Sequence, residues 1–86
     1  MTVIYKYRIA VTDEQVVQMP RGADTLCCQI QSNVPCIWAR VDSSQGLTER
    51  RFRIFGTGHA IPDGVNLEYL DTFQMPGLVF HIFEVL

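Results

Sequence analysis

The chain has 86 residues, a net charge of −2, 48% hydrophobic residues and 19% charged residues. This length allows one small domain of modest stability, because such a chain buries only about 60–65% of its surface on folding. The composition excludes a disordered chain and a membrane-spanning segment of ~20 apolar residues, and the slight negative charge argues against general binding of DNA or RNA.

Apolar and polar residues alternate at the start of the chain. One face of a predicted strand carries Val3, Tyr5, Tyr7 and Ile9, and the other, wetter face carries Ile4, Lys6 and Arg8. Thr12 and Gln15 match a weak helix-capping pattern. The segment before Pro20 therefore forms either a short helical turn or a strand over Gln15–Met19.

The clearest hairpin pairs Thr25–Gln31 with Cys36–Val41. Leu26, Cys28 and Ile30 are expected on one face of the first strand, opposite Thr25, Cys27, Gln29 and Gln31. Ser32–Pro35 reads as the turn, because Asn tolerates a left-handed backbone and Pro cannot continue a central ladder.

Three more strands are predicted in the second half, over residues 50–55, 67–73 and 78–86. Gly56–Gly64 is irregular, and Met75-Pro76-Gly77 is a compact turn. The resulting fold class is all-β with at most one short helix. Six to seven antiparallel strands would form a small sandwich or partly open barrel.

The last strand, Leu78–Leu86, is the most apolar segment of the chain. Such a run is typical of a strand buried on both faces. In so small a domain a second copy of the chain is one partner for the second face. We therefore expect a homo-oligomer that uses this strand, by strand pairing or by face packing.

Cys27, Cys28 and Cys36 match neither a disulfide framework nor a zinc-binding pattern. Met1–Lys6 has no signal-peptide pattern. These features favour reduced, structural thiols in a cytoplasmic protein, without a metal or other cofactor.

A basic segment followed by glycines carries the strongest functional signal. Arg51 and Arg53 share a strand face, and a Gly-x-Gly turn follows, whose backbone N–H groups can approach an anion closely. This combination has the chemistry of a phosphate pocket, but a solvated strand face that runs into a glycine-rich turn is the more common explanation of the same residues. The candidate ligand-binding residues, which include two aromatic residues able to stack on a base, are Arg51, Arg53, Gly56, Thr57, Gly58, His59, Trp38 and Tyr69.

Other chemistry has less support in the sequence. Trp38 is better explained as a core or interface residue than as a base-stacking residue, and His81 is best explained as a core or interface histidine. Asp63, Glu68 and Asp71 lie near His59 in sequence, but their spacing does not indicate an acid–base pair. We therefore do not expect an enzyme.

The segments Val34–Asp42, Phe52–Ile61, Tyr69–Gln74 and Leu78–Phe83 together resemble a group of short proteins of tailed phages and prophages. The resemblance runs from Tyr5 to near the C-terminus, and Gly-Thr-Gly-His is its sharpest element. It implies a phage-encoded protein that acts in the bacterial host cytoplasm, and it brings no catalytic residue with it.

Two functions follow from this setting. By analogy with small phage proteins that oppose host defence, an oligomer would sequester a nucleotide signal, such as a cyclic oligonucleotide or an ADP-ribose derivative. The alternative is a protein–protein interaction module, an inhibitor of a host protein or a virion accessory, without a small-molecule ligand.

Overall fold

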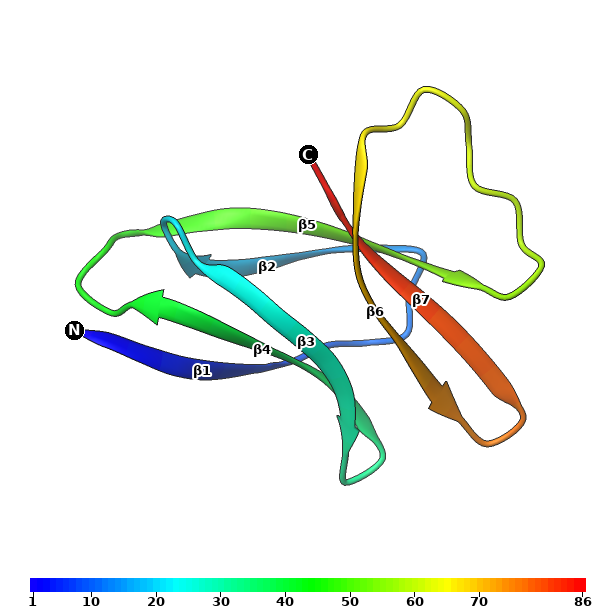
Figure 1. Cartoon of the computed structure of the whole chain (residues 1–86), viewed down its shortest axis with the longest axis horizontal. Coiled ribbons are helices and arrows are strands. Elements are labelled where there is room, and N and C mark those ends of the chain that lie inside the picture. Colours follow the sequence, from blue (N-terminus) through cyan, green and yellow to red (C-terminus); the bar gives the residue numbers. More distant parts are fainter.

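The computed structural model describes all 86 residues and contains seven strands and no helix (Figure 1). The strands are β1 (Thr2–Arg8), β2 (Glu14–Pro20), β3 (Asp24–Gln31), β4 (Val34–Asp42), β5 (Leu47–Gly56), β6 (Leu67–Met75) and β7 (Leu78–Val85). They form two antiparallel sheets, with the orders β1-β4-β3 and β2-β5-β7-β6. The predicted all-β class and number of strands are confirmed. No helix long and apolar enough to cross a membrane is present.

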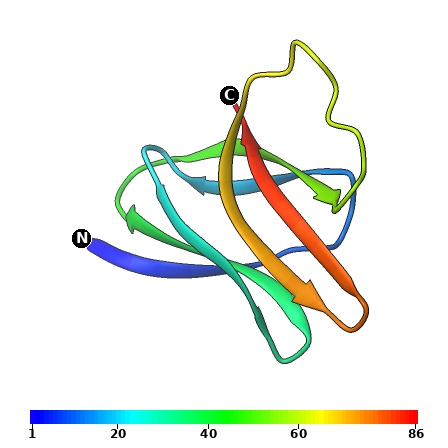
Figure 2. The ribbon, with the colours of Figure 1, turned by 45° about the vertical axis from the view of Figure 1, so that its right-hand side comes forward.

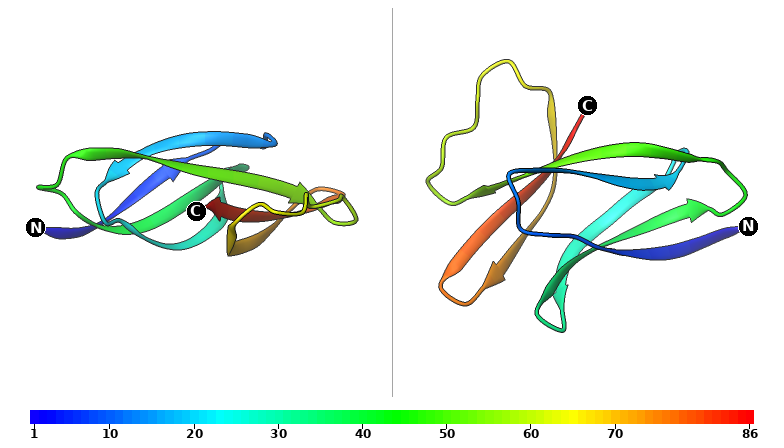
Figure 3. Two further views of the ribbon diagram at one scale, coloured as in Figure 1. Left: turned by 90° about the horizontal axis from the view of Figure 1, so that it is seen from above. Right: turned by 180° about the vertical axis from the view of Figure 1, so that it is seen from behind.

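The two sheets pack as a small sandwich, which is shallow along one axis (Figures 2 and 3). The core lies between their inner faces, where Ile37 and Ala39 of β4 meet Phe52 of β5 and Ile82 of β7. All four side chains are fully buried. Burial of apolar surface of this kind is the main stabilising contribution to a domain of this size.

The segment after β1 contains no helical turn, and the strand alternative for this region is confirmed by β2. The Gln15 side chain bonds to the preceding loop instead of capping a helix. Its amide donates to the carbonyl oxygen of Ala10 (2.6 Å) and to Thr12 Oγ1 (3.1 Å), and its oxygen accepts from the Ala10 N–H (3.1 Å). Gln15 thus ties the turn to β2.

The β3–β4 hairpin is present, but its turn is shorter than predicted. Only Ser32 and Asn33 lie between the strands, with φ values of 52° and 64°. Positive φ at both central residues is typical of a type I′ turn. Pro35 belongs to β4, opposite Ile30 and beyond the last residue pair that β4 makes with β1, so it interrupts no β1–β4 hydrogen bond.

A β-bulge in β3 overturns the expectation that Leu26 shares a face with Cys28. Thr25 pairs with Ala39 and Cys27 pairs with Trp38, so Leu26 is the extra residue of the bulge. Its side chain is 44% exposed, whereas Cys28 is fully buried. One inserted residue in a strand reverses the sheet face on which the residues before it lie, relative to the residues after it.

A second bulge, in β6, lies between Tyr69 and Asp71. It leaves Leu70 unpaired and places Asp71 opposite Ile82, whose side chain points into the core. Asp71 Oδ2 there accepts a hydrogen bond from the backbone N–H of Cys28 at 2.9 Å. This bond joins β6 of one sheet to β3 of the other.

The apolar strand β7 lies between β5 and β6, at the centre of its sheet. Both of its edges therefore carry hydrogen bonds within the chain. The prediction that β7 pairs with a strand of a second copy is wrong. Ile82 is its one fully buried residue, while His81, Phe83 and Val85 on the outer face are half-buried. The prediction of burial on both faces thus holds only in part.

We predict that Asp71→Ala lowers the free energy of unfolding by about 1–3 kcal/mol, because the Cys28 N–H loses its acceptor. For a domain of this size each kcal/mol corresponds to about 4–8 °C in melting temperature. Asp63→Ala, in the exposed loop, is the matched control and should shift it little. Equal melting temperatures for the two variants would contradict this role of Asp71.

We predict three free thiols, of which Cys28 is inert in the folded protein. Cys28 is buried, and burial raises the pKa of its thiol to about 12, so the reactive thiolate is scarce at pH 8. Cys36 is also buried, and Cys27 is half-buried. Titration with a thiol reagent should label Cys27 at most before denaturation and all three thiols after it. Fewer than three thiols in denatured, unreduced protein would indicate a disulfide.

Candidate functional site

The three arginines of β5 differ in their partners. Arg50 forms a two-pronged ion pair with Glu84, donating through Nε to one carboxylate oxygen and through Nη2 to the other, and its Nη1 donates to the Ala23 carbonyl oxygen at 2.8 Å. These hydrogen bonds to Glu84 raise the pKa of Arg50 above its ordinary value. Arg50 therefore serves the fold.

Arg51 and Arg53 share the outer face of the four-stranded sheet, as predicted. Arg51 lies 3.6 Å from Glu14, so its charge already has a partner. Arg53 makes no ion pair with a carboxylate, and its Nε is the one buried side-chain nitrogen or oxygen without a hydrogen-bond partner. Its guanidinium carbon lies 5.1 Å from the centre of the Phe55 ring, within cation–π distance. The Arg53 guanidinium is thus positioned by Phe55 but has no carboxylate partner.

Gly56-Thr57-Gly58-His59 forms a tight turn directly after β5. The His59 N–H donates to the Gly56 carbonyl oxygen at 3.0 Å, and Gly58 has a φ of 88°. A positive φ at this position is typical of a type II turn and favours glycine. A Cβ on Gly56 would lie 3.0 Å from two atoms of the His59 ring, so the absence of a side chain at residue 56 lets the imidazole pack against the strand.

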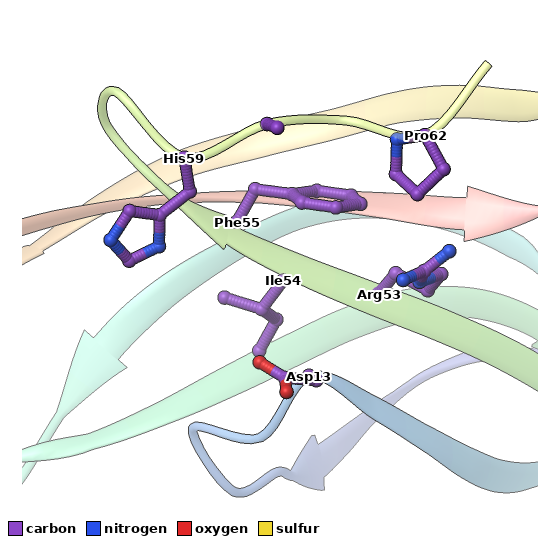
Figure 4. Close-up of a pocket in the computed structure, with 7 residues that line it drawn as sticks. Asp13, Arg53, Ile54, Phe55, His59 and Pro62 are labelled. Carbon is purple, nitrogen blue, oxygen red and sulfur yellow. The ribbon is translucent and has the colours of Figure 1, made fainter.

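A pocket of about 200 Å³ lies between β5, the loop that follows it and the start of β2. Figure 4 shows Phe55 beneath the loop, with His59 towards one end and Arg53 towards the other. The lining residues are Asp13, Arg53, Ile54, Phe55, His59, Ala60 and Pro62. The structure therefore brings two of the sequence-predicted residues, Arg53 and His59, to the lining of one partly open pocket.

Thr57 is turned away from this pocket. Its Oγ1 lies 2.8 Å from His81 Nε2, and its N–H donates to the Val79 carbonyl oxygen at 3.2 Å. His81 Nδ1 lies 3.0 Å from Thr72 Oγ1. Both ring nitrogens of His81 are therefore hydrogen-bonded on the outer sheet face, and this histidine belongs neither to the core nor to the pocket.

The two predicted aromatic residues lie in different sheets. Trp38 lies on the outer face of β1-β4-β3, because it alternates with the buried Ile37 and Ala39. It cannot stack on a ligand bound to Arg53. Tyr69 of β6 lies on the same face as Arg53, in the same cross-strand row, with Phe83 of β7 between them. It does not line the pocket.

Five of the seven pocket residues were not predicted from the sequence, among them Phe55 and Asp13. Phe55 follows Arg53 by two positions, so strand alternation already placed it on the same face. Asp13 gave no signal, because its place beside β5 depends on the pairing of β2 with β5. The pocket lining does not include Asp63, Glu68 or Asp71. The Asp71 carboxylate instead accepts hydrogen bonds from the backbone N–H groups of Cys28 and Thr72. No cluster of three or more His, Cys, Asp or Glu side chains could hold a metal ion.

The fold and the site define a small β-sandwich protein with a pocket that combines a basic residue, an imidazole and an aromatic ring. A family model described as a domain of unknown function (DUF7352) matches residues 1–86, and the chain belongs to this family. No curated protein and no solved structure matches the chain.

We predict that Gly56→Ala displaces the His59 ring while the protein stays folded. The new Cβ would overlap the imidazole, but the backbone at residue 56 is one that alanine adopts. The NMR signals of the His59 ring should shift relative to the wild type, with a small change in melting temperature. Gly46→Ala, whose Cβ would meet no atom within 4 Å, is the control. Unchanged His59 signals in folded Gly56→Ala would show that the ring does not pack here.

Proposed function

We propose that this protein binds a small phosphate-bearing nucleotide, with a phosphate group in the pocket between Arg53 and His59. The unpaired guanidinium of Arg53 carries this proposal. No carboxylate neutralises the charge of this guanidinium, and a phosphate in the pocket would supply the missing counter-charge. Stacking on Phe55 holds the guanidinium in place, so little side-chain freedom is lost on binding.

The His59 end of the pocket adds a second donor. The imidazole lines the pocket and is positioned by the turn that begins at Gly56. Arginine and histidine together suit an anion with several oxygens, because each can donate to a different one.

Asp13 restricts the orientation of the ligand. Asp13 lies beside β5, directly before β2, and its backbone carbonyl oxygen accepts a hydrogen bond from the Ile54 N–H at 3.2 Å. A carboxylate repels phosphate and accepts hydrogen bonds from sugar hydroxyls. A ligand with a sugar on each side of its phosphates, such as an ADP-ribose derivative or a cyclic dinucleotide, satisfies both groups.

The role we propose is sequestration of such a nucleotide signal by a phage-encoded protein in the bacterial cytoplasm, which counters host defence. The resemblance to phage proteins supports the setting. Self-association also belongs to this proposal. Since β7 is internal to its sheet, a second copy would pair at one of the edge strands, which are β1 and β3 in one sheet and β2 and β6 in the other.

A protein–protein interaction module is the second candidate. Large apolar side chains outside the pocket are exposed to solvent, among them Ile4 at 60% and Leu47 at 66%. Exposed apolar area of this kind is typical of surfaces that contact another protein.

We predict that Arg53→Ala weakens nucleotide binding about ten- to a hundredfold, as expected for loss of one charge-assisted contact. Arg51→Ala is the matched control, because Arg51 shares the same strand face but is paired with Glu14 outside the pocket. It should change the affinity by less than about threefold. His59→Ala should behave like Arg53→Ala. The measurement is calorimetric titration with ADP-ribose and with cyclic di-AMP.

The ligand should be recovered chemically unaltered after heat denaturation of the complex, as sequestration requires. Equal losses for Arg51→Ala and Arg53→Ala would point to general surface charge instead of the pocket. If neither nucleotide nor pyrophosphate binds to folded wild-type protein, the phosphate site is wrong and the protein-interaction module takes its place.

A further inference from the structure

Tyr69 is exposed but held in one orientation. The residue is 56% exposed, and its ring forms a T-shaped pair with the Phe83 ring, with the ring centres 5.6 Å apart. Its hydroxyl lies 2.7 Å from Thr72 Oγ1. An exposed aromatic ring with both contacts presents a flat surface at small entropic cost, which suits stacking on a planar group.

Hydrogen bonds extend from Tyr69 to the turn beside the pocket. Thr72 Oγ1 lies 3.0 Å from His81 Nδ1, and His81 Nε2 lies 2.8 Å from Thr57 Oγ1. With the neutral His81 protonated on Nε2, every group in the series donates once: Tyr69 to Thr72, Thr72 to His81, His81 to Thr57, and Thr57 to the Val79 carbonyl oxygen. The series therefore positions the ring relative to the Gly-Thr-Gly-His turn.

The pocket is too small for a whole nucleotide. Its volume of about 200 Å³ lies below the range of roughly 300–1,000 Å³ usual for small-molecule sites. A phosphate fits, and the remainder of the ligand must lie on the neighbouring surface. The β7 side of Arg53 offers Phe83 and then Tyr69, one strand further on.

We propose that this outer face of β5-β7-β6 is the nucleoside subsite: the base stacks on Tyr69, and Thr72 and His81 act as positioning residues for that ring. This inference rests on the proposed phosphate site at Arg53. The backbones of Arg53 and Tyr69 are two strand spacings apart, about 9–10 Å. Both side chains project from the same face, so one ribose between base and phosphate allows a single ligand to contact both.

The test compares adenosine 5′-monophosphate with ribose 5-phosphate, which differ only by the base, in calorimetric titrations. Wild-type protein should bind the nucleotide about 5- to 150-fold more tightly, the contribution of one stacked base. Tyr69→Ala should abolish this difference and leave the affinity for ribose 5-phosphate unchanged. Tyr69→Leu, which keeps an apolar side chain at this position, replaces it if the alanine variant does not fold.

Thr72→Val tests the positioning residues, since valine has the shape of threonine but offers no hydroxyl to Tyr69 or His81. It should weaken binding of adenosine 5′-monophosphate but not of ribose 5-phosphate. If Thr72 only supported the fold, the substitution would affect the binding of both compounds alike. Tyr5→Ala, at an exposed tyrosine of the other sheet, is the control and should weaken neither.

The outcomes separate this inference from the proposed function. If wild-type protein binds both compounds equally, or if Tyr69→Ala keeps the preference for the nucleotide, the nucleoside subsite is wrong and the phosphate site stands. If neither compound nor pyrophosphate binds, the phosphate site itself fails. If Tyr69→Ala instead weakens self-association measured by light scattering, the face is an interface between copies and the subsite is overturned.

Discussion

The hydrogen bond from the Cys28 N–H to Asp71 joins two strands that each contain a bulge, and it depends on the bulge in β6. The bulge at Leu26 lies in β3, and the bulge at Leu70 lies in β6, in the other sheet. Without the second bulge, strand alternation would place Asp71 on the outer face with Tyr69, and the carboxylate would not reach β3. An inserted residue thus turns a polar side chain inward to satisfy an edge-strand N–H that would otherwise lack a partner.

The same bulge builds the outer face. In a regular strand, Tyr69 and Thr72 are three residues apart and point to opposite sides. The extra residue at Leu70 brings both to the outer face, where the Tyr69 hydroxyl meets Thr72 and Thr72 meets His81. One irregularity therefore both joins the sheets and aligns the hydrogen-bonded series along the outer face. Loss of Asp71 should consequently disturb the Tyr69 ring as well as the fold.

The sequence predicted the strands and turns well because their signals are local. Apolar alternation marked β1 and β5, and Pro76-Gly77 marked the final turn, where Gly77 has a φ of 78°. The bulges escaped prediction because an inserted residue changes neither composition nor length enough to be noticed. The central position of β7 was also missed: its apolar character indicated burial correctly, but sheet order depends on contacts distant in the sequence.

The candidate site was predictable to the same extent. Alternation placed Arg51 and Arg53 on one face, and the glycines marked the turn that carries His59. Which arginine is unpaired depends on the neighbouring strands: β2 brings Glu14 to Arg51, and β7 brings Glu84 to Arg50. An overall charge of −2 is therefore compatible with an anion site. What attracts a phosphate is a cation that no carboxylate neutralises, and the carboxylates that pair with the other two β5 arginines leave Arg53 as that cation.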